Sequence, residues 1–294
     1  MLWNKNKNDV VFALLSGLVL LLVSGTSLFL IFFIVQSSFP ELSDFINLWP
    51  RLTGESWSPL TNPPTFGIMH AWVSTLIITT ISLTLAVPLG ILVAIFTVEY
   101  APRRLSLIAI QCTEILAGIP AVVYGFVGFV TLLPAIETLF DLPAGETLLA
   151  AGIILAVMIL PYIAAIASSS LNSVSIETRI AGLANGVPKF YVLRKIVLKQ
   201  SLTGIFAGTT LGLAKALGET LAVMMLAGNA VAVPKSVLDR GQPLTSLIAT
   251  ELGEAGVGSP MYEALFSAGA TLMVLVISIN FLFWRLKGRL SYNG

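Results

Sequence analysis

Two ionisable side chains lie inside an apolar stretch that is long enough to cross a membrane. The stretch is 201–228, and it contains Lys215 and Glu219. An ionisable group at bilayer depth is costly and usually faces the protein interior or a water-filled path. Their spacing of four residues predicts that both lie on one face of a helix. Two interpretations follow: a polar route across the membrane, which the cost of intramembrane charge favours, or a buried ion pair that only holds helices together.

A further carboxylate, Glu114, lies in a second apolar stretch, 105–134, shortly before Pro120. Proline at bilayer depth frees backbone groups that neighbouring helices must satisfy or that line a cavity. Glu114 can pair with Lys215, which leaves Glu219 to act alone, and the reverse assignment is equally open. We therefore take all three ionisable residues as candidates for the route.

Small residues recur at every fourth position before Lys215. They are Gly204, Gly208 and Gly212, a spacing that lets the backbones of two helices approach closely in lipid. This pattern predicts a packing face. Lys215 and Glu219 lie about 100° around the helix from it, so they would flank the tight interface.

The composition of the chain indicates an integral membrane protein. Of its 294 residues, 56% are hydrophobic and 11% are charged, with a mean hydropathy of +0.92, whereas soluble domains carry roughly 25% charged residues. The single cysteine, Cys112, excludes an internal disulfide, and with the single histidine, His70, it argues against a zinc or haem site. We expect no cofactor. No His-Glu-x-x-His or Gly-x-Ser-x-Gly motif supports an intramembrane enzyme.

Six apolar segments are each long enough to span roughly 30 Å of hydrocarbon, which predicts an all-α protein with six transmembrane helices. They lie near 10–35, 69–98, 105–134, 147–170, 201–228 and 263–286. We divide the chain into an N-terminal helix with its outer loop, a membrane core that includes the loop 171–200, and a short tail, with bounds 1–68, 69–286 and 287–294.

The distribution of charge orients these segments. Twelve of the fifteen lysines and arginines in the connections fall on one side, and the connections on the other side are mainly acidic. Positive residues stay on the cytoplasmic side of a membrane. We therefore expect both termini to be cytoplasmic.

The loop 171–200 carries five of these cations. Its first part, 175–186, reads as a short helix that ends at a glycine, and a second amphipathic helix begins near Pro188. Two short helices beneath a membrane bundle suit docking to a cytoplasmic partner. The alternative is a basic surface held against anionic lipid.

This loop resembles the EAA loop of ABC-importer permeases, which reads Glu-Ala-Ala, three residues, Gly, nine residues, Ile, any residue, Leu-Pro. The spacing fits throughout, and the matching positions are Ile180, Ala181, Gly182, Gly186, Ile196 and Leu198, followed by Lys199. The glutamate, the second alanine and the proline of the motif are replaced here by Ile180, Gly182 and Lys199.

Three further segments, 114–125, 151–163 and 216–223, resemble the phosphate importer permeases, and of the two paralogous subunits the PstC type. The resemblance implies the type I ABC importer permease (MetI-like) fold in a bacterial inner membrane. That family usually has arginine at the position of Lys215, and it treats the basic and acidic pair of this helix as part of the translocation path, a role we carry over to Lys215 and Glu219.

The resemblance also implies a set of partners. This chain would pair with a PstA-type permease, two ATPase subunits would dock on the 171–200 loops, and a PstS-type binding protein would deliver phosphate from outside. The chain itself would be a transport subunit and no enzyme, because ATP would be hydrolysed by a separate chain. The alternatives are a permease of the same class for sulfate or molybdate, and a purely structural membrane subunit.

Overall fold

The computed structural model describes residues 7–38 and 44–292, and their regular secondary structure is helical except for one short antiparallel hairpin. The first half contains α1 (Lys7–Ser38), α2 (Asp44–Thr53), β1 (Trp57–Ser58), β2 (Thr65–Phe66), α3 (Met69–Ile95), the π-helical η1 (Phe96–Tyr100), α4 (Arg103–Gly118), α5 (Ala121–Val127), η2 (Gly128–Leu132) and α6 (Leu133–Phe140). The second half contains α7 (Leu148–Asn172), α8 (Ile176–Ala184), α9 (Lys189–Val192), η3 (Leu193–Val197), α10 (Leu198–Gly218), α11 (Leu221–Leu226), α12 (Leu244–Glu251) and α13 (Pro260–Tyr292).

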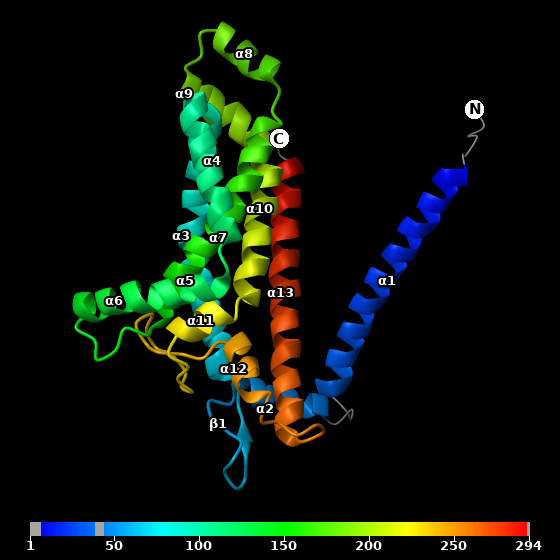
Figure 1. Cartoon of the computed structure of the whole chain (residues 1–294), viewed down its shortest axis with the longest axis vertical. Coiled ribbons are helices and arrows are strands. Elements are labelled where there is room, and N and C mark those ends of the chain that lie inside the picture. Colours follow the sequence, from blue (N-terminus) through cyan, green and yellow to red (C-terminus); the bar gives the residue numbers. More distant parts are fainter. Residues whose placement is uncertain (1–6, 39–43, 293–294) are drawn as a thin grey trace.

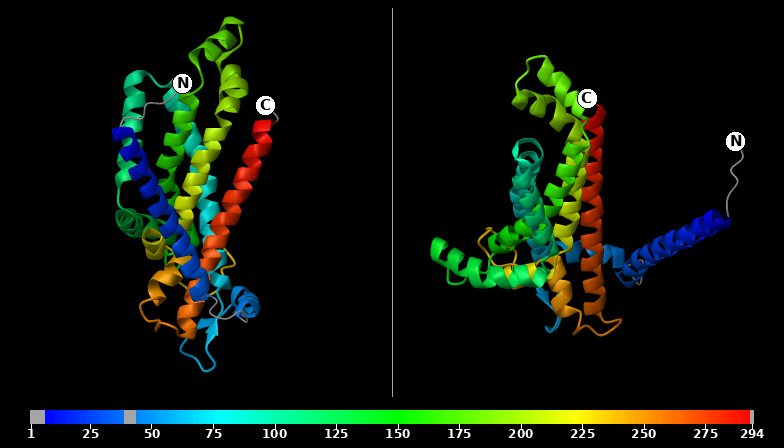
Figure 2. Two further views of the ribbon diagram at one scale, coloured as in Figure 1. Left: turned by 90° about the vertical axis from the view of Figure 1, so that its right-hand side faces the viewer. Right: turned by 45° about the horizontal axis from the view of Figure 1, so that its top comes forward.

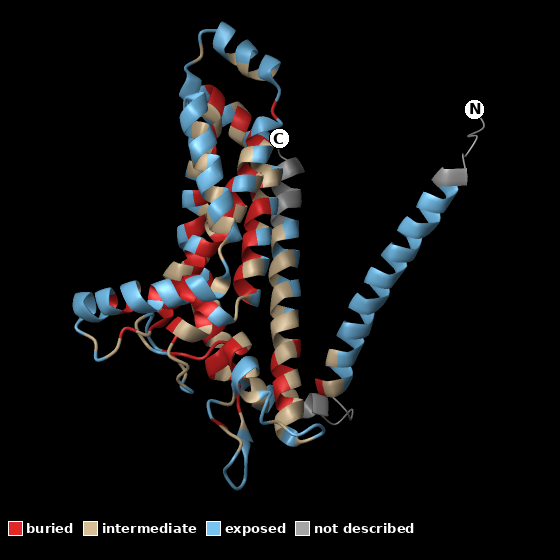
Figure 3. Ribbon diagram, viewed as in Figure 1, coloured by how far each residue is buried: buried red, intermediate tan, exposed pale blue. Residues whose placement is uncertain are grey.

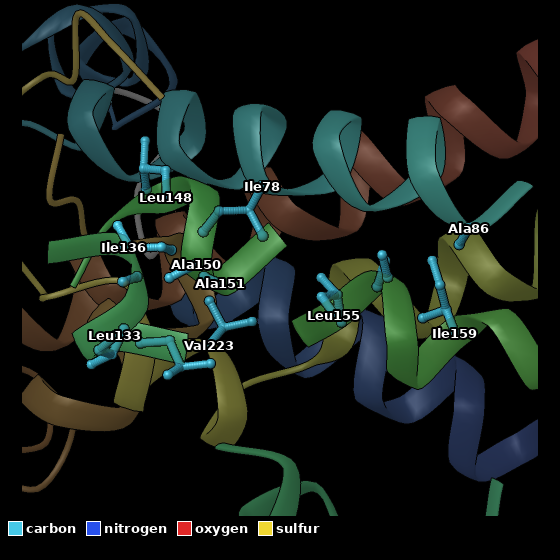
Figure 4. Close-up of a cluster of buried hydrophobic side chains, with 14 of the residues drawn as sticks. Ile78, Ala86, Leu133, Ile136, Leu148, Ala150, Ala151, Leu155, Ile159 and Val223 are labelled. Carbon is cyan, nitrogen blue, oxygen red and sulfur yellow. The ribbon is translucent and has the colours of Figure 1, made fainter. Parts of the chain in front are cut away.

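Helix α7 is the centre of a bundle in which α3, α4, α10 and α13 run side by side (Figure 1). Its buried leucines and isoleucines pack against Ile78 and Ala86 of α3 and Val223 of α11 (Figure 4). Small residues allow the helices to approach closely, because a Cβ atom added at Gly152 of α7 would lie only 2.6 Å from a side-chain carbon of Ile81. One large cluster of buried side chains therefore surrounds α7, and a second joins Trp57, the start of α3, α12 and α13.

The apolar segment 105–134 is not one helix, contrary to the expectation from sequence. Helix α4 ends at Gly118, and the next two residues, Ile119 and Pro120, are extended before α5 begins. Proline disfavours the helical conformation in the residue before it and cannot donate a backbone hydrogen bond. The chain turns at this break, so that α5, η2 and α6 run across the bundle (Figure 2).

The segment 201–228 is also broken. Helix α10 ends at Gly218, Glu219 is extended with φ −74° and ψ 128°, and α11 follows. Glycine weakens a helix by about 1 kcal/mol relative to alanine, and the carbonyl oxygen of Glu219 accepts a hydrogen bond from the Thr245 hydroxyl at 3.0 Å. The expectation that Lys215 and Glu219 share one helical face is therefore wrong, because only Lys215 lies in the helix.

Among the described residues, five helical segments are long and apolar enough to cross a membrane: Val10–Ser38, Met69–Tyr100, Ala121–Phe140, Leu148–Asn172 and Pro260–Arg285. Four of the six predicted spans correspond to continuous members of this set. The fifth predicted span corresponds to α10, which contacts α7 and α13 in the bundle. The third predicted span is divided between α4 and the crosswise segment Ala121–Phe140.

The long connections lie at the two ends of the bundle (Figure 1). The α8–α9 connection, the start of α1 and the end of α13 lie at one end, and α2, the β1–β2 hairpin and α12 lie at the other (Figure 1). Helix α1 leans away from the bundle, and nearly all of its described side chains are exposed (Figure 3). It touches α13 near its C-terminal end, where Phe33 and Phe266 meet edge to face with ring centroids 5.6 Å apart.

Candidate functional site

Lys215 lies half-buried in the last turn of α10 and contacts Tyr162 of α7. Its Nζ atom donates a hydrogen bond to the Tyr162 hydroxyl at 3.1 Å and lies 4.3 Å from the centre of the tyrosine ring. An ammonium group within about 6 Å of an aromatic ring centre is attracted by the negative face of the ring. Tyr162 therefore holds Lys215 in two ways at once.

The ion pairs considered from sequence are not formed. Among the side chains of residues 10–38 and 48–285, no carboxylate oxygen lies within 4.0 Å of Lys215 Nζ. The structure therefore brings neither Glu219 nor Glu114 into a salt bridge with Lys215, and the interpretation of these groups as a buried ion pair has no support in this arrangement.

The Tyr162 hydroxyl also reaches the end of α4. It donates to the carbonyl oxygen of Ala117 at 3.1 Å, while the hydroxyl of Tyr124, from α5, donates to the carbonyl oxygen of Leu116 at 2.8 Å. The last carbonyls of a helix lack intrahelical partners and carry a partial negative charge. The breaks after α4 and α10 therefore meet at Tyr162, with Lys215 beside the electronegative end of α4.

The two candidate carboxylates lie apart from this contact. Glu219 is half-buried, and its Oε1 atom accepts a hydrogen bond from the backbone N–H of Ala222 at 3.4 Å. An open cavity of about 470 Å³ adjoins this segment, lined by Thr220, Thr245, Ile248, Ala249, Leu252 and Gly253. Glu114 is exposed on α4, three residues before Ala117. The cavity reaches Thr220, the residue after Glu219, but Glu219 itself is not among its lining residues.

The glycine stripe of α10 faces α7. A Cβ atom added at Gly212 would lie 2.8 Å from a side-chain carbon of Ile163, one added at Gly208 would lie 3.1 Å from Ile166, and one at Gly204 would collide with Ser170. Close approach of the two backbones needs residues without side chains at these positions. Because Ile163 directly follows Tyr162, this approach also brings the Lys215 ammonium onto the tyrosine ring.

The loop 171–200 forms α8, α9 and η3 at the end of the bundle (Figure 1). Of the positions that match the EAA motif, Ile180, Ala181 and Gly186 are exposed, and Gly182, Ile196 and Leu198 are half-buried. Gly182 permits close packing, since a Cβ there would lie 2.9 Å from Val192. Gly186 has a φ of +73°, which fits the glycine expected just after the end of the first short helix.

Five apolar side chains of this loop are exposed. They are Ile176, Ile180, Leu183, Phe190 and Tyr191. Several exposed apolar side chains on one short segment make this loop a candidate interaction site.

A buried ion pair ties the loop to the end of α3, and the sequence reasoning missed it. Arg179 of α8 pairs with Glu99 of η1, and only 15% of the Arg179 side chain and 9% of the Glu99 side chain are exposed. The Arg179 guanidinium also donates to the carbonyl oxygens of Leu171 and Val174. Burial lowers the pKa of Arg179 from its ordinary value, although arginine stays charged in proteins.

Lys189 adds a second link, because its Nζ atom donates to the backbone carbonyl of Glu99 and lies 4.8 Å from the centre of the Tyr100 ring. The sequence does contain a sign of this contact, because Glu99 is a charged residue close to the end of an apolar segment. Tyr162 was also missed, although it lies inside one of the three segments that carry the family resemblance.

The comparisons with known proteins identify the family. The model of the binding-protein-dependent transport system inner membrane component matches residues 86–292. A phosphate transport system permease protein PstC of Mesorhizobium japonicum is 33% identical over 89% of this chain and 83% of its own length. A probable ABC transporter permease of Bacillus subtilis, YqgH, is 35% identical over 76% of this chain and 72% of its own.

Solved structures of importers share the fold. A bacterial alginate ABC transporter, in complex with an alginate-bound periplasmic protein, superposes with a TM-score of 0.65 at 14% identity and covers 98% of this chain and 97% of its own. An inward-facing MetNI methionine ABC transporter gives 0.55 at 20% identity, covering 76% of this chain and 94% of its own. The chain is thus a multi-pass membrane protein with the ABC importer permease fold, and it belongs to the family of binding-protein-dependent transport system inner membrane components.

Proposed function

We propose that this chain is a transmembrane permease subunit of an ATP-driven importer of inorganic phosphate and forms half of the translocation path. The assignment of phosphate as the substrate rests on the similarity to permeases named for phosphate transport, at 33% identity over most of both chains. A probable phosphate transport system permease protein PstC of Methanocaldococcus jannaschii, also 33% identical, covers 68% of this chain.

The path runs past the junction of the two broken helices. Lys215 supplies a positive charge that no carboxylate neutralises among the described residues. Phosphate carries one or two negative charges near neutral pH, so a cation must offset the acidic groups along its way. Glu219 and Glu114 belong to the same path and keep anion binding weak. A conduit requires weak binding, because a strong site would trap the ion.

The two ends of the bundle serve different partners. The exposed apolar residues of α8 and α9 dock a separate ATPase subunit, with Ile180, Ala181 and Gly186 at the contact. The opposite end receives a PstS-type binding protein that delivers phosphate, and a PstA-type permease completes the path. Both termini lie on the cytoplasmic side of the bacterial inner membrane.

The test is ATP-dependent uptake of labelled phosphate into vesicles that contain this chain and its partner subunits, with sulfate and molybdate as competitors. Uptake that ignores both competitors and stops when this chain is omitted is the expected result. Uptake of sulfate or molybdate in place of phosphate would overturn the substrate, and vesicles that take up none of the three would contradict a transport role.

A further inference from the structure

We propose that Tyr162 is the positioning residue for Lys215, an inference that rests on the proposed function. Tyr162 lies on the central helix α7, between two completely buried isoleucines at positions 159 and 163. The backbone around it is therefore firmly packed. From this position its side chain contacts both broken helices, Lys215 of α10 and Ala117 of α4.

The hydrogen bonds define how the contact works. The Tyr162 hydroxyl accepts from the Lys215 ammonium at 3.1 Å and donates its own proton to the Ala117 carbonyl at 3.1 Å. Its single proton is thus directed at α4, and a lone pair remains for the ammonium. Because the lysine side chain is a flexible stem with rotatable bonds, this acceptor and the aromatic face select one position for its charge.

A neutral hydrogen-bonding partner suits Lys215, because the lysine has to bind an anion. A carboxylate would fix Lys215 as firmly, but it would cancel the positive charge and repel phosphate at the same distance. The tyrosine hydroxyl and ring fix the ammonium while its full charge remains. The absence of a carboxylate beside Lys215, across the part of the chain that the structure describes, is consistent with this role.

Tyr124 provides a matched control. Its hydroxyl donates to the Leu116 carbonyl, one residue before the carbonyl that Tyr162 binds, and the hydrogen bonds of its side chain in the structure do not include Lys215. Tyr124→Phe and Tyr162→Phe therefore each remove one hydroxyl that donates a hydrogen bond to a carbonyl in the last turn of α4. Only Tyr162→Phe also removes the hydrogen-bond acceptor of Lys215.

The experiment compares both variants in the complete importer reconstituted in vesicles, and measures phosphate uptake and ATP hydrolysis against the concentration of phosphate-loaded binding protein. Tyr162→Phe is expected to lower the maximal uptake rate roughly ten-fold, the loss expected for a hydrogen bond to a charged group. ATP hydrolysis and the half-saturating concentration of binding protein should stay unchanged, so less phosphate moves per ATP. Tyr124→Phe should stay within about two-fold of the unaltered importer.

Equal uptake by the two variants would overturn the proposal, because Tyr162 would then act at most as a cap of α4. A parallel loss of ATP hydrolysis or of assembled complex in Tyr162→Phe would also overturn it, since that result indicates a structural role. If the unaltered importer moves no phosphate, the proposed function is wrong, and this inference is wrong with it. If the unaltered importer and the Tyr162→Phe variant take up phosphate equally well, only this inference is wrong.

Discussion

At the residue scale, the position of Lys215 depends on a neighbouring helix. Its backbone belongs to α10, but its ammonium is held by Tyr162 of α7. The two helices come close enough for this contact because Gly212 has no side chain where it meets Ile163. The packing of one glycine and the placement of one charge are therefore linked.

Replacement of Gly212 by leucine tests this link. The new side chain would overlap Ile163, force α10 away from α7 and lower stability by about 1–3 kcal/mol, the usual effect of overpacking. Gly218→Leu is the control, because a Cβ added at Gly218 meets no atom within 4 Å. The melting temperature of the purified complex should fall for Gly212→Leu and change much less for Gly218→Leu; a similar fall in both would contradict the packing account.

Lys215 could be recognised from the sequence, because a charge inside an apolar segment is visible without a structure. Its partner could not, since Tyr162 lies 53 positions away and the contact depends on how α7 and α10 pack. The expected placement of Lys215 and Glu219 on one helix face failed for a local reason. The helix ends at Gly218, and the spacing rule for helices does not apply across a break.

At the element scale, α8 and α9 are connected to the bundle through a few strong contacts. The buried pair of Arg179 and Glu99 is the main one, and Lys189 adds a hydrogen bond to the same glutamate. If an ATPase docks on the apolar face of this loop, any movement of the loop is passed to η1 and α3 through this pair.

Arg179→Met should loosen the loop. Removing one partner of a buried ion pair leaves the other charge uncompensated and costs about 3–5 kcal/mol. We expect faster chymotrypsin cleavage after the exposed Phe190 or Tyr191 and less phosphate uptake per ATP. Arg104→Met, which removes an exposed arginine at the same end of the bundle, should change neither. Unchanged cleavage in Arg179→Met would show that the pair does not anchor the loop.

The elements themselves were largely predictable. Long apolar runs predicted α1, α3, α7 and α13, because the hydrophobic residues extend over each whole span. The loop helices followed from Gly186 and Pro188, which mark where one short helix stops and the next begins. The break at Pro120 was not predicted as a change of direction, because apolar residues continue on both sides of it.

At the scale of the whole molecule, the two ends of the bundle differ in charge and in construction. The basic end carries the α8–α9 loop, and the other end carries the hairpin, α2 and α12 (Figure 1). Helix α1 exposes its apolar side chains along almost its full length (Figure 3), which suits a helix surrounded by lipid or by a second membrane subunit. The fold similarity to the alginate transporter covers 98% of this chain.

The proposed orientation can be tested with single cysteines introduced into a Cys112→Ser background. Leu60, at the tip of the hairpin, is 97% exposed, and Ile180 of α8 is 56% exposed. A membrane-impermeant maleimide should label Leu60→Cys in intact cells, and it should label Ile180→Cys only after the membrane is permeabilised. The opposite pattern would reverse the assignment of both termini to the cytoplasm.

The most direct measurement of the central claim is phosphate uptake by the reconstituted importer carrying Lys215→Gln, with Lys215→Arg as the charge-preserving control. Glutamine has a polar side chain of moderate length but no charge, so uptake should be lost while the assembled complex is recovered in full. Arginine keeps the charge and should retain substantial uptake. Normal uptake by Lys215→Gln, or loss of the assembled complex in that variant, would contradict the claim that phosphate passes this lysine.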